Sequence, residues 1–350
     1  MRKDKNVTIY DIARESGVSP ATVSRVLNGK VKVAEQKRLK VLKVMEDLDF
    51  HPNLMARNLP VQQSKTIGVI LPDISNPFFS QYFVALERYA LIKGYTMYLC
   101  NTMNNACKEH GDMESLYLSS LLERRVDGLV YLGGRINAKK IDPLHLAELN
   151  SVAQKIPMVL VNGRAKGVDT HIVRTKEREG FMEMVEYVVS QGHTEIALIG
   201  GIEGVITSDL KYRAFKDVMN KYSLAYNPKW LRPHGFSIES GERTFYSLLQ
   251  SEKKPTAAIC INDYVAMGVI RGALKRGFSL PHDLSVSGFD NIELSAHSYP
   301  SISTVSHRYD VLAEKSLDVL FSLIAGAPCP KETTIPMELV LRESIVAPSA

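Results

Sequence analysis

Residues 8–29 read Thr-Ile-Tyr-Asp-Ile-Ala-Arg-Glu-Ser-Gly-Val-Ser-Pro-Ala-Thr-Val-Ser-Arg-Val-Leu-Asn-Gly, a stretch that predicts a helix, a tight turn and a second helix. Thr8 can cap the first helix, and Asp11 follows three residues later to complete a capping box. Gly17 stands where a glycine in the left-handed conformation ends a helix. Ser19 can cap the second helix. The stretch therefore predicts two short helices that pack against each other across a turn.

The second helix has one apolar and one polar face. Pro20 can occupy its first position, where a missing N–H costs nothing. Its inner face carries apolar residues at helical spacing, and its outer face is left to Ala21, Thr22, Ser24 and Arg25. This pattern fits an ordinary helical hairpin, and it also fits a helix-turn-helix unit whose second helix enters the major groove of DNA.

The distribution of charge favours the DNA-binding alternative. Residues 1–60 hold 12 Lys and Arg against 7 Asp and Glu, so their net charge of +5 equals that of the whole 350-residue chain. Residues 61–350 are therefore balanced. An excess of positive charge confined to one end is typical of a nucleic-acid-binding module joined to a neutral domain.

Residues 8–29 closely resemble the headpiece of the lactose-repressor and galactose-repressor (LacI/GalR) family of bacterial transcription regulators. The resemblance extends through most of the chain, with further matches in order: Val-Asp-Gly-Leu-Val at 126–130, Ile-Pro-Met-Val at 156–159, Gln-Gly-His at 191–193, Pro-Thr-Ala-Ala at 255–258, Asn-Asp at 262–263 and Gly-Phe-Asp-Asn at 288–291. It implies a sequence-specific DNA-binding transcriptional regulator, with repression as the family default.

From residue 66 onward, apolar runs alternate with amphipathic segments. Strands that alternate with helices predict parallel sheets, and two such sets in tandem predict two doubly wound lobes with a cleft at the carboxyl ends of the strands. The family resemblance implies a periplasmic-binding-protein-like architecture for this part. The expected fold is therefore a small all-α helix-turn-helix headpiece followed by an α/β two-lobed core with two doubly wound parallel sheets.

These patterns divide the chain into a headpiece at 1–52, a hinge helix and linker at 53–65, and a core for effector binding and dimerisation at 66–350. A third headpiece helix is expected over 34–48, with an inner face of Leu39, Leu42, Met45 and Leu48. The resemblance implies three crossings between the lobes, near Asn162, His307 and Pro330. By that implication the first lobe spans about 66–162 and 307–330, and the second spans about 163–306 and 331–346.

Residues that lead the second helix would read the edges of bases. Arg25 can make a bidentate contact to guanine, with a phosphate contact or an internal ion pair as the alternatives. Pro20 and Ala21 are short and apolar, so at best they touch a thymine methyl group. Contacts to phosphate, which position the protein without specifying sequence, are expected from Thr8, Ser19, Thr22, Ser24 and Asn28.

Residues 53–59 match the family's hinge helix, which is too short to be stable alone in water. By that match, two hinge helices of a dimer pack together in the minor groove at the centre of the operator. Leu59 would then be the wedge that unstacks the central base step, and Ala56 the small residue that allows close approach. An ordinary linker leucine is the alternative for Leu59.

In the first lobe, Phe79 resembles the family's ring that packs on the effector, and a core position is its alternative. Asp73 and Asn76 precede it in the same loop and could supply polar contacts. Asn162 ends the fourth strand, where relatives often place a polar or acidic contact. These residues are our candidates for the first wall of the effector cleft.

In the second lobe, Asp263 and Asp290 each follow an apolar strand, and carboxylates at such tips suit a ligand rich in hydroxyl groups. Asp290 is the strongest of these candidates, whereas capping of the next helix explains Asp263 equally well. Phe236 matches a position that often lines the pocket. Lys211 stands where the family often carries an arginine that reaches into the cleft, so a planar bidentate donor is replaced by a point charge.

The expected partners are a pseudo-palindromic double-stranded DNA operator, a second copy of the chain, and a small-molecule effector. A sugar or sugar derivative is the default effector. The alternative is a nucleoside or purine ligand in an activator or a corepressor-dependent repressor. No heptad tail follows residue 344, so we expect a dimer and no tetramer. The sequence leaves open whether the effector releases or promotes DNA binding.

Other classes of protein are disfavoured by what the sequence lacks. The chain begins without a secretory signal and holds no apolar run that could span a membrane, so a cytoplasmic location is expected. Its cysteines, Cys100, Cys107, Cys260 and Cys329, have no metal-binding spacing and are expected to be reduced thiols. The glycine-rich residues 200–204 fit neither nucleotide-binding pattern. We therefore expect no metal, no cofactor and no enzymatic activity.

Overall fold

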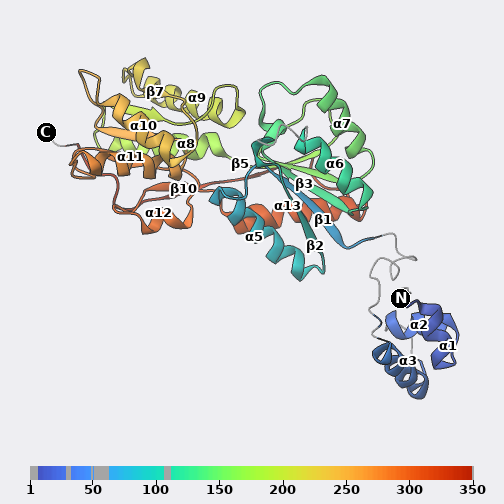
Figure 1. The fold of residues 1–350 in the computed structure, drawn as a ribbon. Coiled ribbons are helices and arrows are strands. Elements are labelled where there is room, and N and C mark those ends of the chain that lie inside the picture. Colours follow the sequence, from blue (N-terminus) through green and yellow to red (C-terminus); the bar gives the residue numbers. More distant parts are fainter. Residues whose placement is uncertain (1–6, 29–32, 49, 51–62, 106–111, 349–350) are drawn as a thin grey trace. The chain divides into compact units, whose positions relative to one another are not determined.

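The computed structural model describes residues 7–28, 33–48, 50, 63–105 and 112–348, and the chain forms two compact units, Met1–Ser64 and Lys65–Ala350 (Figure 1). The predicted hinge residues Ala56 and Leu59 lie outside the described residues. No helix in the described part of the chain is long and apolar enough to cross a membrane.

The first unit contains three helices among its described residues: α1 (Ile9–Ser16), α2 (Pro20–Asn28) and α3 (Glu35–Asp47). The predicted caps of α1 are confirmed. The Thr8 hydroxyl accepts from the Asp11 N–H at 3.4 Å, and the Asp11 carboxylate accepts from the Thr8 N–H at 3.0 Å. Gly17 ends the helix with a φ of 65°. The Ser19 hydroxyl accepts from the Thr22 N–H at 3.3 Å, as expected of a cap.

The predicted inner face of α3 is wrong in register. Val41 is fully buried with Ile12 and Val23, and of the four predicted residues only Met45 packs against this core, whereas Leu39, Leu42 and Leu48 are exposed. Leu39 and Leu42, and likewise Val41 and Val44, recur at a spacing of three residues, so periodicity alone could not choose between the two faces. The valine face closes the core of the unit.

The second unit contains two lobes, the first built on a six-stranded parallel sheet with the order β11-β5-β4-β3-β1-β2. Helices α5 (Pro77–Ile92) and α13 (Tyr309–Ile324) cover one face, and α6 (Met113–Glu123) and α7 (Pro143–Ala153) cover the other. The strands are β1 (Thr66–Leu71), β2 (Thr96–Asn101), β3 (Gly128–Leu132), β4 (Met158–Val161), β5 (His171–Thr175) and β11 (Glu332–Ile335), with 3-10 turns η1 (Met103–Asn105) and η3 (Gly134–Asn137).

The second lobe has a four-stranded parallel sheet with the order β7-β6-β8-β9. Helices α8 (Glu177–Ser190) and α9 (Ile206–Lys221) cover one face, and α10 (Ile238–Leu248) and α11 (Asp263–Lys275) cover the other. The strands are β6 (Ile196–Ile199), β7 (Leu231–Arg232), β8 (Ala257–Cys260) and β9 (Ser285–Ser287); η4 (Pro228–Trp230), α12 (Glu293–His297) and the antiparallel pair β10 (Thr304–Ser306) and β12 (Glu338–Val340) complete the lobe. The expected pair of doubly wound sheets is confirmed.

Two of the predicted lobe crossings fall later in the chain than expected. Strand β5 pairs with β4, and β11 pairs with β5, so both belong to the first sheet. The chain therefore leaves the first lobe after Thr175 and not near Asn162, and leaves it again after Ile335 and not near Pro330. Strands β5 and β11 mix polar and apolar residues, which hid them from a search for continuous apolar runs. The middle crossing, at His307 between β10 and α13, lies where it was expected.

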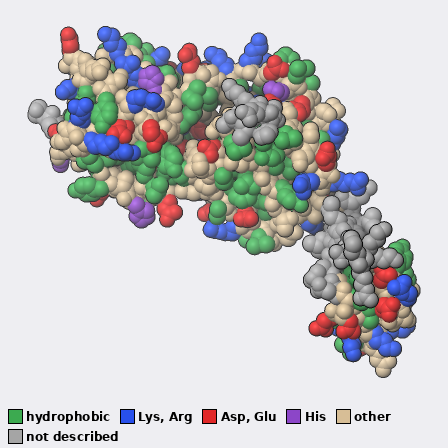
Figure 2. All heavy atoms as spheres, in the orientation of Figure 1, with side chains coloured by type: hydrophobic (Ala, Val, Ile, Leu, Met, Phe, Trp, Pro, Cys, Tyr) green, Lys and Arg blue, Asp and Glu red, His purple; other side chains and the backbone are tan. Residues whose placement is uncertain are grey.

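The surface of the second unit carries no single-sign charged region on the face shown in Figure 2, where Lys and Arg side chains are interspersed with Asp and Glu. This distribution agrees with the balanced charge of residues 61–350. The excess positive charge of the chain is therefore confined to residues 1–60.

Candidate functional site

Helix α2 presents the predicted DNA-reading side chains on its outer face. Pro20, Ala21 and Arg25 are exposed, while Val23 is fully buried against the other two helices. No carboxylate among the described residues pairs with Arg25, whose side chain is exposed. Arg14 on α1 differs from Arg25 in this respect, because its guanidinium pairs with the Asp11 carboxylate at 3.1 Å.

The predicted phosphate contacts are small polar residues around the same helix. Ser19 and Thr22 share a hydrogen bond at 3.0 Å between their hydroxyls, and Thr8 is exposed at the start of α1. Ser24 is partly buried. The side chain of Asn28 lies outside what the structure describes.

A cleft of about 770 Å³ lies between the two lobes, at the carboxyl ends of their strands. The lobes also touch across it, where the Lys139 N–H donates to the Gly204 carbonyl at 3.0 Å and Ala138 bridges to Val205. A volume of this size suits a small organic ligand. Seven of the eight predicted effector residues line the cleft: Asp73, Asn76, Phe79, Asn162, Lys211, Phe236 and Asp290.

Asp263 is the predicted residue that the structure does not bring to the cleft. It is fully buried at the start of α11, where it accepts from the Thr304 hydroxyl at 2.6 Å and the Ile292 N–H at 2.8 Å. The helix is capped instead by Asn262, which accepts from the Val265 N–H at 2.9 Å and does line the cleft. Asp263 therefore fixes the loop after β9, and its neighbour takes the place predicted for it.

Lys211 is held inside the cleft by two contacts. Its ammonium group donates to the Ile261 carbonyl at 3.1 Å and lies 3.6 Å from the centre of the Phe289 ring. The side chain is buried, so the cation and the aromatic face are largely shielded from water, which strengthens their attraction. The lysine is thus fixed by the protein before any ligand is present.

A chain of hydrogen bonds runs between the lobes behind the cleft. His307 Nε2 lies 3.1 Å from the Asp290 carboxylate in the second lobe, and Nδ1 lies 3.1 Å from the Thr175 hydroxyl in the first. The Asn162 side-chain carbonyl accepts from the Thr175 N–H at 2.8 Å. The His307 ring also packs against Phe78, with 4.7 Å between ring centres. Sequence reasoning missed His307 as a cleft residue, because a single histidine on a crossing has no periodic signal.

Burial acts in opposite directions on the two members of the central pair. It raises the pKa of the Asp290 carboxyl to about 7, against the opposing charge of Lys211. It lowers the pKa of the His307 imidazole to about 4, which the charge of Glu177 opposes. Asp290 also has a φ of 105°, a left-handed conformation that costs a non-glycine residue roughly 1–3 kcal/mol. Such strain is common at binding sites.

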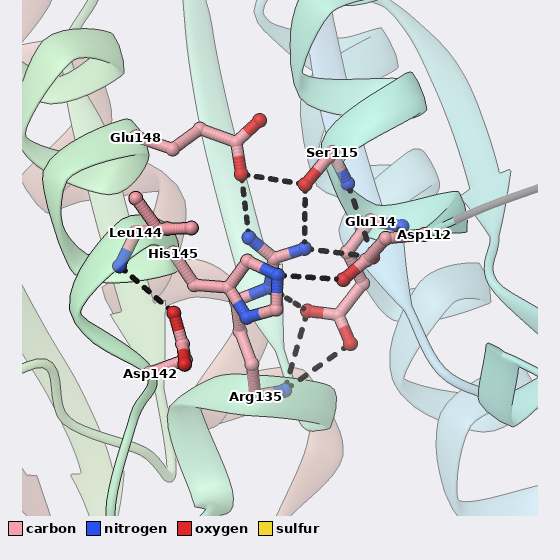
Figure 3. Close-up of polar contacts among 8 residues, drawn as sticks. All are labelled: Asp112, Glu114, Ser115, Arg135, Asp142, Leu144, His145 and Glu148. Carbon is pink, nitrogen blue, oxygen red and sulfur yellow. Dashed lines mark hydrogen bonds and ion pairs between the residues drawn. The ribbon is translucent and has the colours of Figure 1, made fainter.

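A second cavity of about 250 Å³ in the first lobe adjoins the cleft at Pro72, Asn104 and Gly134. Its wall is a buried ion-pair network around Arg135 (Figure 3). The guanidinium contacts three carboxylates, those of Asp112 at 2.8 Å, Glu114 at 3.0 Å and Glu148 at 2.6 Å. Burial raises the pKa of Glu114 even against the charge of Arg135. The network ties η3, α6 and α7 together and stiffens one wall of the cleft.

Comparison with known protein families matches both units of the chain. The family described as bacterial regulatory proteins, lacI family, matches residues 8–53, and a periplasmic binding protein-like domain matches residues 185–345. The HTH-type transcriptional repressor PurR of Histophilus somni (strain 129Pt) is 31% identical over 97% of this chain and 98% of its own length. Catabolite control protein A of Priestia megaterium is 34% identical over 87% of this chain and 89% of its own length.

Solved structures give the same result. The lac repressor dimer bound to operator and the anti-inducer ONPF matches with a TM-score of 0.84 and 26% identity, over 98% of this chain and 100% of that one. A LacI family transcriptional regulator from Enterococcus faecium with bound ribose matches with a TM-score of 0.69 and 26% identity, over 81% and 99% of the two chains. The resemblance in residues 8–29 is thereby confirmed, and the chain belongs to the LacI family of bacterial regulatory proteins.

Proposed function

We propose that this chain is a homodimeric transcriptional repressor that binds a pseudo-palindromic operator and responds to a small-molecule effector in the cleft. The observation that carries the proposal is that one chain combines two features. Helix α2 exposes a face that can read DNA, and the second unit holds a cleft between two lobes that the chain crosses three times. The related lac repressor forms a dimer on its operator, and a related regulator binds ribose. A bacterial transcriptional regulator binds the chromosome, which lies in the cytoplasm, so we place this protein there.

The contacts to DNA follow from the exposed face of α2. Arg25 reads a guanine in each half-site, and Pro20 and Ala21 lie against the groove floor. The hydroxyls of Thr8, Ser19, Thr22 and Ser24 hold phosphates, as does Asn28. Leu59 and Ala56 act at the operator centre, as in the family match.

The effector is a sugar or sugar derivative. Its hydroxyl groups are held by Asp73, Asn76 and Asn162 from the first lobe and by Lys211 and Asp290 from the second. Phe79 and Phe236 pack on its carbon faces. Because the ligand contacts both lobes, its binding changes their relation to each other and therefore the spacing of the two hinge segments in a dimer.

Selection of binding sites from random duplex DNA, at a fixed salt concentration, tests the DNA-binding half of the proposal. We expect a pseudo-palindrome with a guanine in each half-site. Failure to enrich any sequence, with and without a pool of sugars and purines, would contradict it.

Asp290→Asn tests the effector half on the operator so obtained. We expect operator affinity within about twofold of wild type, because Asp290 lies in the other unit of the chain. Measured at pH 8, where the Asp290 carboxyl with its pKa of about 7 is mostly ionised, the response to any effector should weaken by tenfold or more, since hydrogen bonds to a charged group contribute about 1.5–3 kcal/mol. An unchanged response, measured by fluorescence anisotropy, would mean that the effector binds elsewhere.

A further inference from the structure

Glu177 is a largely buried residue that lines the cleft, and its carboxylate has no partner among the described residues. It occupies the first turn of α8, directly after the crossing from the first lobe, and 9% of its surface is exposed. No hydrogen bond or ion pair joins its carboxylate to any residue that the structure describes. His307, which also lines the cleft and feels the charge of Glu177, is kept neutral because burial lowers its pKa to about 4. No described residue donates to this carboxylate, so water in the cleft or a bound ligand has to supply the donor.

The cleft as a whole carries an excess of negative charge. Among the described residues that line it, four have carboxyl groups and one has a cationic group: Asp73, Glu177, Glu203 and Asp290 against Lys211. Even if Asp290 is counted as neutral, because burial raises its pKa to about 7, carboxylates outnumber the cation. The lysine is already engaged by the Ile261 carbonyl and the Phe289 ring. An anionic ligand would therefore enter a site in which carboxylates outnumber the one cation among the described lining residues.

We propose that Glu177 is an effector-binding residue and that the cleft takes an uncharged or aminated sugar in preference to a sugar acid or sugar phosphate. The carboxylate accepts from a hydroxyl or ammonium group of the ligand, which supplies the missing donor. A phosphate or carboxylate at that position would be repelled by Glu177 and would lose its hydration without compensation. This inference rests on the proposed effector function and narrows its ligand class.

The alternative is that Glu177 serves only the positive end of the α8 helix dipole. Glu179 provides the matched control, because it lies in the same first turn, carries the same charge, is exposed and does not line the cleft. A role confined to the helix dipole predicts equal effects when either residue is changed to glutamine. A role in ligand binding predicts that Glu177→Gln and Glu179→Gln differ, both in the unfolding temperature without ligand and in the affinity for the ligand.

The first experiment compares the thermal unfolding of ligand-free Glu177→Gln and Glu179→Gln in the full-length protein at pH 7. We expect Glu177→Gln to unfold at a temperature roughly 2–4 °C higher than Glu179→Gln, because it removes a charge that is held at a largely buried position and that no described protein group pairs. Equal or reversed temperatures would show that the protein already satisfies Glu177, which would overturn the inference. This comparison needs no knowledge of the effector.

The second experiment titrates the wild type and both variants with matched sugars, namely glucose, glucosamine and glucose 6-phosphate, and the same three forms of galactose and mannose. We expect a neutral or amino form to bind more tightly than its phosphate, and Glu177→Gln to weaken that binding about tenfold or more while Glu179→Gln leaves it within about twofold. Tighter binding of a phosphate would overturn the inference. If no sugar binds the wild type, the carbohydrate part of the proposed function fails, and the unfolding comparison alone decides the role of Glu177.

Discussion

At the scale of single residues, Arg25 should carry much of the sequence discrimination. It is exposed on α2 and unpaired with any described carboxylate, so Arg25→Ala removes a base contact without disturbing a protein contact. We expect it to lose about 1–3 kcal/mol of preference for the operator over random DNA while keeping most of its salt-dependent nonspecific affinity. Affinities for both DNAs, measured over a range of salt concentrations, test this. An equal loss on both would assign Arg25 to phosphate contact instead.

The pair Asp290 and His307 should leave a distinct pH signature. Burial raises the pKa of Asp290 from 3.8 to about 7, so its contribution to folding stability falls as the pH rises between these values. Burial lowers the pKa of His307 from 6.5 to about 4, so its contribution rises with pH over nearly the same range. In the wild type the two contributions largely cancel, because one proton is bound to the pair in both the folded and unfolded chain.

Changing one member should expose the contribution of the other. Relative to wild type, we expect His307→Gln to lose stability as the pH rises from 4.5 to 6.5, by up to about 1.4 kcal/mol per pH unit. Asp290→Asn should gain relative stability over the same range. Urea denaturation at several pH values measures both trends. Parallel curves for all three proteins would mean that the pair does not titrate as a unit.

Residues at strand tips were predictable from sequence, and those at the crossings were not. Asp290 and Lys211 stand in recognisable family motifs, which placed them correctly in the cleft wall. Glu177 and His307 lie on crossings between the lobes, where the surrounding residues show neither helical nor strand periodicity that would distinguish a cleft side chain. Asp263 was misplaced by one residue, because Asn262 is as good a cap and the sequence does not show which of the two faces the cleft.

At the scale of elements, helices α10 and α11 depend on glycine for their close contact. A Cβ on Gly268 would lie 2.0 Å from the Ile238 carbonyl oxygen, which is backbone and cannot turn aside. Gly268→Ala should therefore destabilise the protein by about 1–3 kcal/mol or more, because the two helices must move apart. It should also disturb the hydrogen bond at 3.1 Å from the Asn262 amide to the Phe236 carbonyl, which joins the segments that lead into the two helices at the cleft.

Gly272→Ala is the matched control on the same helix. Its Cβ would lie 2.9 Å from a ring carbon of Phe245, a side chain that can shift. We expect a milder loss of stability than for Gly268→Ala when both are compared by thermal unfolding. A Gly268→Ala protein that unfolds at the wild-type temperature would show that the two helices can separate at little cost.

The sequence predicted the ends of helices correctly where hydrogen bonds or backbone conformation of nearby residues determine them. The caps at Thr8 and Gly17 use side-chain oxygens and a left-handed φ, and both are present as predicted. Pairing between distant strands is different, because β11 joins β5 across more than 150 residues and nothing local specifies that neighbour. The two misplaced crossings have this cause, whereas the face of α3 was misjudged because two faces of one helix are similarly apolar.

At the scale of the whole molecule, the second unit exposes large apolar side chains on both of its lobes. Leu91 on α5, Tyr98 on the edge strand β2, and Leu294 and Tyr299 near α12 are all exposed. Exposed apolar side chains on an edge strand and its neighbouring helix favour association with another chain. The related lac repressor forms a dimer, and a second copy is the partner we expect to cover these residues.

Leu91→Glu tests whether this surface forms the dimer. A charge placed among desolvated apolar side chains is costly, so we expect the variant to sediment as a monomer at concentrations where the wild type is a dimer. Leu144→Glu is the control, because Leu144 is 80% exposed against 71% for Leu91 but lies on α7, which covers the opposite face of the first sheet.

The loss of the dimer should also be visible on DNA. Two headpieces on one dimer bind two half-sites with a high effective local concentration, and separate monomers lose that advantage. Leu91→Glu should therefore bind a full operator little better than a single half-site, although Arg25 and the rest of α2 are unchanged. Leu144→Glu should keep the wild-type preference for the full operator. A dimeric Leu91→Glu protein with full operator affinity would place the dimer interface on another surface of the core.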